Sequence, residues 1–370
     1  MFDCIVIGAG VNGLLSALRL NAEGRSVYVV DKGAAAREAS WAGGGILSPL
    51  FPWRCADAVS ELARYGHETY PALADELYQE TDIDPEWLRC GMLYLDREQH
   101  CAAQRWSQRW GYVCETLVGA ALATVSPALA ASAAAAFWFP DVAQIRPPRL
   151  GRALLRLARR RGIEIAVHMP AKGLALKADR VAGVRFDRGV IAARTVLLTA
   201  GAWSGDFLQG VAGAGALPVQ PVKGQMAALR HRPGRLGPVL LSADRYLIQR
   251  RDGCVLVGST VEFAGYDKTT DAQTVAALRR DAVALVPELA HAPLARAWAG
   301  LRPGKCDNMP VIGPHPALSG LFINAGHYRN GIILAPGSAR LITDLMMQRA
   351  PWTDPQPFAA PNVNKCAAGA

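Results

Sequence analysis

The sequence predicts a mixed α/β (α+β) protein of two domains, and its length, its composition and its first thirty residues all favour this class. At 370 residues the chain is too long for one ordinary core, and 51% of its residues are apolar. Residues 2–31 read as one strand–helix–strand unit, the building block of a parallel sheet. The absence of heptads and fixed-period repeats excludes a fibre or a repeat array.

The N-terminal unit carries a dinucleotide-binding pattern. An apolar strand is followed by Gly8-Ala-Gly10-Val-Asn-Gly13, an amphipathic helix, and a second strand that ends at Asp31. Gly8 permits the tight turn, Gly10 lets the backbone approach a pyrophosphate, and Gly13 lets the helix and the strand pack closely. Asp31 stands where a carboxylate can accept from both hydroxyls of a ribose. The combination predicts a Rossmann-like domain, although it does not separate NAD from FAD.

Three further segments fit a cofactor-binding sheet. Residues 37–47 form a small-residue loop whose backbone N–H groups suit an anion or a flat ring, with a flexible linker as the alternative. Residues 195–204 read as a buried strand that ends in small residues. Residues 319–325 read as a strand and residues 326–336 as a glycine-rich loop before a helix, whose N-terminus would stabilise the negative charge of a reduced flavin. An ordinary crossover is the alternative for this last segment. The expected helix shows one apolar face, formed by Leu341, Ile342, Leu345 and Met346.

Seven pieces of the chain carry a family resemblance: IVIGAGVNG, SWAGGGIL, LLTAGAWSG, PVKGQM, DGCVLVGSTVE, WAGLRPGKCDNMPVIGPHP and GHYRNGIILAP. Together they resemble the glycine oxidase branch of the D-amino acid oxidase family of flavoproteins, as found in thiamine biosynthesis. The resemblance covers nearly the whole chain and implies non-covalent FAD in a Rossmann-like domain. With the glycines of the first turn, the expected cofactor-binding residues are Gly8, Gly10, Val11, Asn12, Gly13, Asp31, Lys32, Ala39, Ser40, Gly44, Gly45, Ile46, Ala171, Gly201, His327, Tyr328, Arg329, Asn330, Gly331, Ile332 and Ile333.

An amino-acid substrate offers one carboxylate, which arginine binds best because its guanidinium can donate two parallel hydrogen bonds. Arg302 ends a predicted strand over residues 297–301, so we expect it at the tip of an element, with a surface arginine as the alternative. The resemblance assigns this arginine of the G-L-R-P motif to the substrate carboxylate. It adds Arg329 as a second arginine near the substrate, Tyr246 as a hydroxyl donor and wall, and Ile46. Without the resemblance, Arg329 would cap loop carbonyls and Tyr246 would be an ordinary strand residue.

The chain departs from its relatives where a substrate would enter. The glycine triplet 43–45 and Ile46 stand where many relatives carry alanines and then a methionine, so we expect a more flexible loop there. Asp244 and Arg245 would put charges at the mouth of the site. Val261 is small for a pocket wall. These differences leave the preferred amine open.

Two other residues are assigned structural roles. Sarcosine oxidases attach their flavin through a cysteine in the region of Cys306, but the spacing to the following Pro-Val-Ile-Gly is several residues too short here. We therefore expect a free thiol at Cys306. His327 is expected to anchor the backbone of its loop and not to act as a base.

The resemblance implies the reaction. We expect FAD-dependent oxidative deamination of a small amino acid, glycine first, to glyoxylate, ammonia and hydrogen peroxide by hydride transfer from the α-carbon to flavin N5. With the carboxylate held by Arg302 and Tyr246, no general base is required. The implied partners are oxygen, a thiazole synthase that receives the imine, and further copies of the chain in a homotetramer. The alternatives are a D-amino acid or sarcosine dehydrogenase with another electron acceptor, and an RNA-acting flavin module that cleaves a modified tRNA base.

The net charge of +9 bears on the RNA alternative, because basic surfaces bind phosphate. The one dense arginine cluster, at residues 156–161, closes a predicted helix whose apolar positions are Leu150, Leu154 and Leu157. Cations in the last turn of a helix offset its dipole, which is the simpler interpretation. Binding of an anionic partner by this cluster is the alternative interpretation.

The expected cellular location rests on three features that the sequence does not show: paired cysteines, a signal peptide and a membrane span. The eight cysteines include no C-x-x-C pair, which argues against a metal site and indicates a reduced, cytoplasmic protein. No basic region precedes the first strand, so we expect no signal peptide. Residues 117–139 carry no charge, but they are rich in alanine and contain Pro127. We expect this stretch to be a segment of a soluble protein and not a membrane span.

The predicted domains are discontinuous, because the cofactor-binding sheet needs residues from the beginning, middle and end of the chain. We predict that residues 1–80, 145–215 and 305–350 form the FAD-binding domain. Residues 81–144 and 216–304 then form a substrate domain with an antiparallel sheet, and residues 351–370 form a tail.

Overall fold

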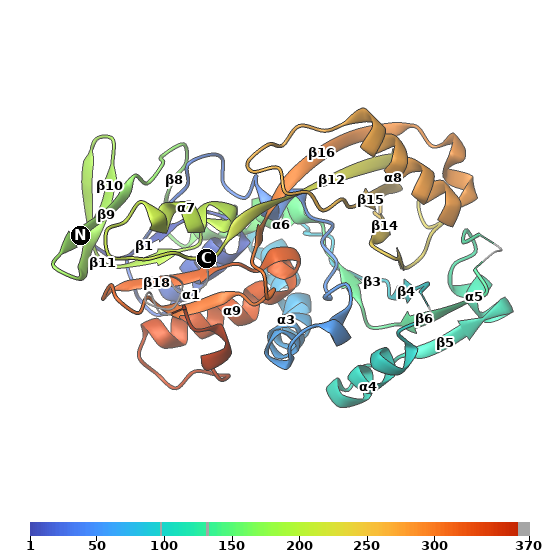
Figure 1. Ribbon diagram of the computed structural model, residues 1–370, viewed down its shortest axis with the longest axis horizontal. Helices are drawn as coiled ribbons and strands as arrows, with labels where there is room; N and C mark the ends of the chain where they lie inside the picture. Colours follow the sequence, from blue (N-terminus) through green and yellow to red (C-terminus); the bar gives the residue numbers. More distant parts are fainter. Residues whose placement is uncertain (97, 131–132, 362–370) are drawn as a thin grey trace.

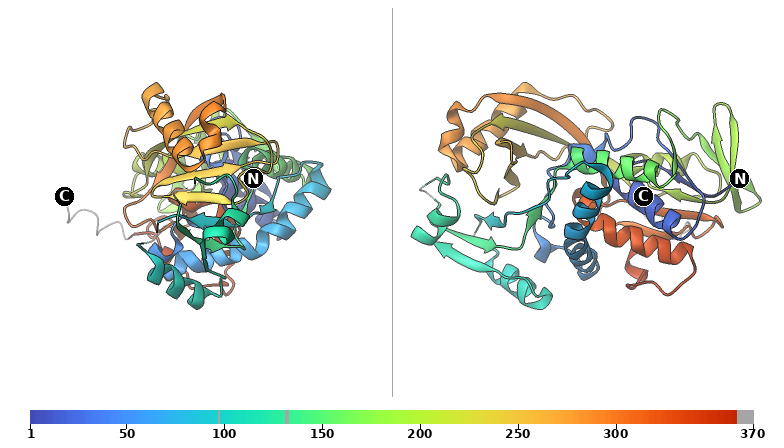
Figure 2. Two further views of the ribbon diagram at one scale, coloured as in Figure 1. Left: turned by 90° about the vertical axis from the view of Figure 1, so that its right-hand side faces the viewer. Right: turned by 180° about the vertical axis from the view of Figure 1, so that it is seen from behind.

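The computed structural model describes residues 1–96, 98–130 and 133–361. Within these residues the strands form two sheets of eight strands each and one sheet of two. Figure 1 shows the first sheet at the left, beside the N-terminus, and the second at the right. The helix α3 (Asp57–Thr81) lies between the two halves, in Figure 1 and in the view from behind in Figure 2. The predicted mixed α/β fold is confirmed.

The first sheet combines distant parts of the chain, as predicted. Its order is β17-β18-β11-β1-β2-β8, and a β10–β9 hairpin continues from β11. The strand β1 pairs in parallel with β2 and β11, and β11 pairs in parallel with β18. The strands are β1 (Phe2–Ile7), β2 (Val27–Val30), β8 (Glu164–Ala166), β9 (Gly173–Lys177), β10 (Arg180–Phe186), β11 (Gly189–Leu198), β17 (Val311–Pro314) and β18 (Leu321–Ala325).

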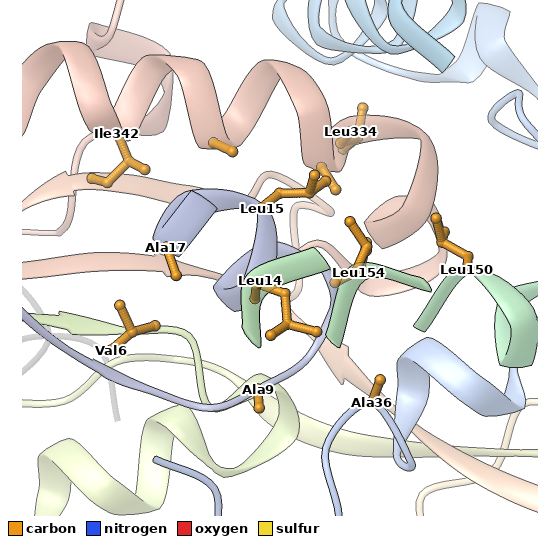
Figure 3. Packing of buried hydrophobic residues seen from close by; sticks show 14 of the residues in the cluster. Val6, Ala9, Leu14, Leu15, Ala17, Ala36, Leu150, Leu154, Leu334 and Ile342 are labelled. Carbon is orange, nitrogen blue, oxygen red and sulfur yellow. The ribbon is translucent and has the colours of Figure 1, made fainter. Parts of the chain in front are cut away.

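Helices cover one face of this sheet. They are α1 (Val11–Ala22), α3, α6 (Pro147–Arg160) and α9 (Gly331–Met346). Figure 3 shows how the apolar stripes of α1, α6 and α9 meet over β1, with Val6 of β1, Leu14 and Ala17 of α1, Leu154 of α6 and Leu334 of α9 in one cluster. All five of these side chains are buried, so the helices are held chiefly by this apolar contact.

The arginine cluster closes α6, as predicted. The three leucines of the apolar stripe are buried, and the last turn contains Arg159 and Arg160. Arg161 lies 3.3 Å from Glu80 of α3, and Arg156 lies 3.9 Å from Asp82. Acidic groups of the chain itself thus face part of the basic cluster.

The second sheet has the order β16-β12-β15-β14-β13-β4-β6-β5, and its pairs are antiparallel except for β13 with β4. Side chains alternate across it, as a strand period of two requires. Leu247 packs into the core beneath the helix α8 (Ala272–Leu285), while Tyr246 and Ile248 face the other side. The strands are β4 (Met92–Tyr94), β5 (Glu115–Val118), β6 (Ala135–Phe139), β12 (Gln220–Arg230), β13 (Val239–Ser242), β14 (Arg245–Gln249), β15 (Cys254–Gly258) and β16 (Leu294–Gly304).

The remaining elements are short. The two-stranded sheet consists of β3 (Leu88–Arg89) and β7 (Ala143–Gln144). The short helices are α2 (Ala39–Ala42), α4 (His100–Trp110), α5 (Gly119–Val125) and α7 (Ser204–Gln209), and the 3-10 turns are η1 (Pro52–Arg54), η2 (Gly201–Trp203), η3 (Pro287–His291), η4 (Tyr328–Asn330) and η5 (Gln356–Phe358).

Two predicted boundaries are wrong. The glycine-rich loop that we expected to reach residue 336 ends at Asn330, and α9 begins at Gly331 and carries Pro336 in its interior. Arg302 is not at the tip of its strand, because β16 pairs with β12 through Gly304. In both places glycine and proline residues predicted the end of an element, whereas packing against neighbouring elements lets the helix or the strand continue.

The uncharged stretch 117–139 contributes β5, α5 and β6 to the second half of the molecule. Within the described residues no helix has the length and apolar character to cross a membrane. Every strand of the first sheet falls within the ranges predicted for the FAD-binding domain, and the strands of the second sheet fall within the other two ranges. The domain boundaries themselves stay a prediction.

Candidate cofactor and substrate site

A cavity of about 540 Å³ is lined by residues of both sheets. One end is formed by the β1–α1 turn and the residues after β2 and β11. The other end is formed by β12, β14 and β16 of the second sheet and by the loop before α9. Its position at the carboxyl ends of parallel strands is where open α/β sheets bind ligands.

The first turn is as tight as the glycine pattern predicts. Gly8 has φ +110°, and a Cβ on it would lie 2.8 Å from the carbonyl carbon of Thr199. A Cβ on Gly13 would collide with the carbonyl oxygen of Gly8 and lie 2.6 Å from Thr199 Oγ1. Thr199 Oγ1 donates to that same carbonyl at 2.8 Å. The glycines therefore bring helix and strand together and leave the N-terminus of α1 open to the cavity, a site suited to phosphate.

Asp31 lies at the end of β2, with its carboxylate held by the backbone. It accepts from Ala9 N at 2.8 Å and from Gly33 N at 2.9 Å. A carboxylate has about four lone-pair positions, so both oxygens retain capacity for the hydroxyls of a ribose. Burial raises the pKa of Asp31. The neighbouring Lys32 places Nζ 3.2 Å from the ring centre of Trp203, and burial lowers the pKa of Lys32.

The glycine triplet is tied down by hydrogen bonds and does not form a loose linker. Ile145 N donates to the carbonyl of Gly45 at 2.8 Å. The buried Arg250 donates to the carbonyls of Gly44 and Ile145, the second at 3.0 Å, and to Gln144 Oε1 at 2.7 Å. Burial lowers the pKa of Arg250 to about 10. The loop is thus anchored by a cation whose bonded partners are all neutral.

The segment before α9 brings His327, Tyr328 and Arg329 to the cavity wall. His327 is buried, and its Nε2 lies 3.1 Å from Ser338 Oγ of α9. Burial lowers the pKa of His327 to about 3, so its ring is neutral at physiological pH. Asn12 of α1 donates to the carbonyl of Gly331 at 3.4 Å and thereby joins the first turn to this segment.

Arg302 lies on β16 with its guanidinium fixed by three acceptors. Its Nη1 donates to the carbonyls of Lys223 at 3.2 Å and Thr260 at 3.1 Å, and its Nη2 donates to Ser259 Oγ at 2.6 Å. No carboxylate of the described residues lies within 4.0 Å of this guanidinium. Burial lowers the pKa of Arg302. The result is a covered, oriented cation that lacks a counter-ion from the described part of the chain.

Arg329 and Tyr246 complete this end of the cavity. Arg329 Nη1 lies 3.9 Å from Asp244, whose side chain is mostly exposed, and the buried Nε of Arg329 has no hydrogen-bond partner among the described residues. Tyr246 is buried, and its hydroxyl donates to Met226 Sδ at 3.1 Å. A thioether is a weak acceptor, so this hydroxyl is available to a stronger one.

The cavity brings together nearly all the residues predicted for the site. Two of them, Gly13 and Asn330, do not line it: Gly13 acts through helix–strand contact, and Asn330 lies at the N-cap position of α9. Val261 is 41% exposed and does not line the cavity, so its interpretation as a pocket wall is wrong. Cys306 is exposed and also lies outside the lining.

Sequence reasoning missed several residues of the wall. Trp203 and Ser259 lay within motifs that were recognised only as patterns. Thr199 lies in a recognised motif too, and Arg250 lies outside the cavity lining, but the hydrogen bonds that give them their roles join residues 191 and 206 positions apart and could not be predicted from the sequence. Gly224 also escaped notice, although a Cβ there would collide with the guanidinium of Arg302.

The residues present fit FAD. Buried polar atoms that lack a partner within the described residues face this region, Asn12 Oδ1 at the first turn and Arg329 Nε at the other end. Between them the wall has no room for a side chain at Gly44, because a Cβ there would lie 2.8 Å from Ile248 Cδ1 and 3.0 Å from Tyr246 Cε2. A polar end, a helix N-terminus and an apolar slot match an adenosine, a pyrophosphate and a flat ring. No group of His, Cys, Asp and Glu among the described residues is arranged to hold a metal ion.

Comparison with known proteins agrees with this fit. Residues 3–345 match the family described as FAD dependent oxidoreductase. The chain is 44% identical to the glycine oxidase of Pseudomonas aeruginosa over 96% of this chain and 97% of that protein. It resembles the crystal structure of glycine oxidase from Geobacillus kaustophilus with a TM-score of 0.91, at 28% identity over 98% of both chains. It is 30% identical to the bifunctional protein ThiO/ThiG of Trichormus variabilis over 94% of this chain and 53% of that protein.

Proposed function

The chain belongs to the family of FAD-dependent oxidoreductases, and on this premise we propose that it deaminates glycine oxidatively to glyoxylate and ammonia. When bound, FAD supplies the redox chemistry, by accepting a hydride from the α-carbon and passing the electrons to oxygen as hydrogen peroxide. The resulting imine hydrolyses in water to glyoxylate and ammonia wherever no other enzyme takes it first. The protein's own contribution is to bind and orient the amino acid.

The observation that carries this proposal is the state of Arg302. A covered guanidinium with three neutral hydrogen-bond partners and no carboxylate within 4.0 Å among the described residues is stabilised when a ligand brings an anion. The planar carboxylate of an amino acid matches the fork of the guanidinium. Tyr246 adds a hydroxyl that its present partner, Met226 Sδ, engages weakly. The similarity to a glycine oxidase over most of the chain supports glycine as the amino acid.

Among the residues that the structure describes, no free general base lies in the cavity wall beside this arginine. Within the described lining, Glu38 is engaged by Lys268 at 2.9 Å and Asp206 by Tyr266 at 2.7 Å, while Asp31 accepts from the backbone. His327 is a weak base, because burial lowers its pKa to about 3, and its Nε2 lies 3.1 Å from Ser338 Oγ. The substrate therefore binds with its amine already neutral, and the residues of the cavity wall hold its α-carbon in place.

The test is peroxide release by the purified holoenzyme given glycine, sarcosine, D-alanine or D-proline separately. We expect peroxide with glycine, and a fall in kcat/KM of at least about a hundredfold in Arg302→Ala, because a buried charged hydrogen-bonding pair is lost. Arg230→Ala is the matched control, since Arg230 is an exposed arginine of the neighbouring strand β12 outside the cavity lining.

Other outcomes separate the alternatives. Flavin bleaching by an amine without peroxide would indicate a dehydrogenase that uses another acceptor. Absence of bleaching with every amine, together with salt-dependent tRNA binding, would support the RNA-acting module. Full activity in Arg302→Ala would contradict the proposed carboxylate site.

We propose three further properties from the family resemblance. The imine is handed to a thiazole synthase, the chain assembles as a homotetramer, and it works in the cytoplasm. The transfer of the imine gains support from the bifunctional protein ThiO/ThiG. The chain matches only 53% of that protein, so the remainder of that protein is long enough to form a second enzyme. Light scattering of the purified protein tests the tetramer.

A further inference from the structure

The guanidinium of Arg302 depends on a segment that has little regular structure. We name residues 259–271, which run from the end of β15 to the start of α8, the crossing segment. Two of the three acceptors of Arg302, Ser259 Oγ and the carbonyl of Thr260, belong to it. Within the described residues its strand-like pairing is limited to a single bridge between Glu262 and Lys223. Whatever holds the crossing segment therefore also orients Arg302.

Lys223 of β12 is the centre of that attachment. Its backbone N donates to the carbonyl of Glu262 at 2.9 Å, and Glu262 N donates back at 3.0 Å. Its side chain is only 6% exposed, and its Nζ lies 2.6 Å from Asp267 and 3.7 Å from Glu262. The carbonyl of Lys223 is also the third acceptor of Arg302. One residue thus contacts the guanidinium directly and ties down the segment that carries the other two acceptors.

Gln225, two residues further along β12, reinforces the attachment. Its backbone N donates to Thr260 Oγ1 at 2.8 Å, and its Nε2 donates to Glu262 at 3.0 Å. Its Oε1 accepts from Asp271 N at 2.8 Å. Lys223 and Gln225 therefore hold the crossing segment along its length chiefly by side chains and not by a ladder of strand pairs.

The crossing segment also reaches the cofactor end of the cavity. The ring of Tyr266 stacks on Trp203 with centroids 5.3 Å apart, and Lys268 pairs with Glu38 at 2.9 Å. Trp203 and Glu38 both line the cavity. The segment is thus attached at both ends of the site. Lys223 contacts it through Glu262, close to Ser259 and Thr260, and through Asp267, which lies between the two residues that reach the cofactor end.

We propose that Lys223, through its ion pairs with Asp267 and Glu262, is a positioning residue that holds Arg302 in the orientation that binds the substrate carboxylate. This inference rests on the proposed function, because it takes Arg302 to be the carboxylate site. Without the ion pairs the crossing segment moves, Ser259 and Thr260 leave the guanidinium, and the carboxylate is held less precisely. The hydride-transfer step itself involves no atom of Lys223.

The test compares carboxylate binding in four holoenzyme variants. Acetate serves as the probe, with its Kd measured from the change that it causes in the flavin absorbance. We expect Lys223→Met to raise the Kd of acetate and the KM of glycine by about tenfold each with kcat nearly unchanged, because small displacements of a charged clamp weaken it at this scale. Asp267→Asn should act in the same direction but less strongly. Asp267 is 42% exposed, so this second variant folds even where Lys223→Met does not.

Arg349→Met is the matched control. Arg349 also joins two carboxylates, Asp344 at 2.6 Å and Glu23 at 2.9 Å, but it lies beyond the end of α9 and outside the cavity lining. We expect Arg349→Met to lower the stability of the protein without changing the Kd of acetate. An unchanged Kd in both Lys223→Met and Asp267→Asn would overturn the proposal, provided that Arg302→Ala abolishes acetate binding. If Arg302→Ala also leaves the Kd unchanged, the carboxylate site itself is wrong and both proposals fall.

Discussion

Several buried ionisable residues at this site have only neutral hydrogen-bond partners. Arg302 and Arg250 are covered guanidinium groups that donate to carbonyls, a hydroxyl and an amide, and His327 is a covered ring beside a serine hydroxyl. Partners of this kind satisfy hydrogen bonds without neutralising charge. Arg302 therefore keeps the cavity receptive to an anion, while Arg250 anchors the glycine triplet and His327 stays uncharged.

The buried histidine makes stability depend on pH. The pKa of His327 is about 3 in the folded protein, below its ordinary value of 6.5, so between these values the unfolded chain binds a proton that the folded chain does not. Stability is therefore fully present above pH 6.5 and is lost as the pH falls. The contribution approaches about 1.4 kcal/mol per pH unit in that range.

We expect His327→Gln to flatten this dependence. The amide retains a hydrogen-bonding group near Ser338 but does not titrate. Urea unfolding of both proteins with saturating FAD at pH 7.5, 6.5, 5.5 and 4.5 measures the difference. Parallel curves of the free energy of unfolding against pH would contradict the assignment.

At the scale of elements, the closeness of α1 to the first sheet decides whether the phosphate end of the cavity exists. Gly13 has no space for a side chain, because Gly8 and Thr199 occupy the position of its Cβ. The N-terminus of α1 points into the cavity only while this contact holds. A change here acts on packing and on cofactor binding together.

We expect Gly13→Ala to destabilise the protein by about 1–3 kcal/mol, the usual cost of overpacking, and to weaken FAD binding. Gly313→Ala is the control, since a Cβ on this glycine of β17 would meet nothing within 4 Å among the described residues. Thermal unfolding and the fluorescence of released flavin give the two quantities. Equal behaviour of the two variants would show that the contact is not tight.

At the scale of the whole molecule, the cofactor site exists only in the folded chain. Residues at the end of β1, after β11 and before α9 are far apart in the sequence but line one cavity, and the hydrogen bond from Asn12 to Gly331 spans 319 positions. A ligand that binds such a site stabilises the folded state alone, by about 2.7 kcal/mol at a concentration one hundred times its Kd. FAD therefore supports both halves of the molecule at once.

We expect acid or heat to release FAD from the denatured protein into solution, because Cys306 is exposed and lies outside the cavity lining. Removing FAD under native conditions should lower Tm, and adding it back should restore Tm. Cys306→Ser should behave like the unaltered chain in both measurements. Flavin that stays with the precipitated protein would indicate a covalent bond and contradict the prediction.

The sequence by itself determined the features that arise within a few residues. The turn from Gly8 to Gly13, the acid that ends β2, and the apolar stripe and basic end of α6 are local patterns with local physical causes. The resemblance then extended these patterns to the cofactor and to the arginines of the substrate end. All but two of the predicted site residues line the cavity.

Only the tertiary structure decided the rest. Pro336 and Gly331 read as loop residues, yet α9 contains both because it packs against α1 and α3. The anchor of the glycine triplet by Arg250 and the attachment of the crossing segment by Lys223 join residues that no sequence spacing connects. A buried charge takes its partners from whatever the fold brings within about 3 Å, so its role is set by packing and not by its neighbours in the chain.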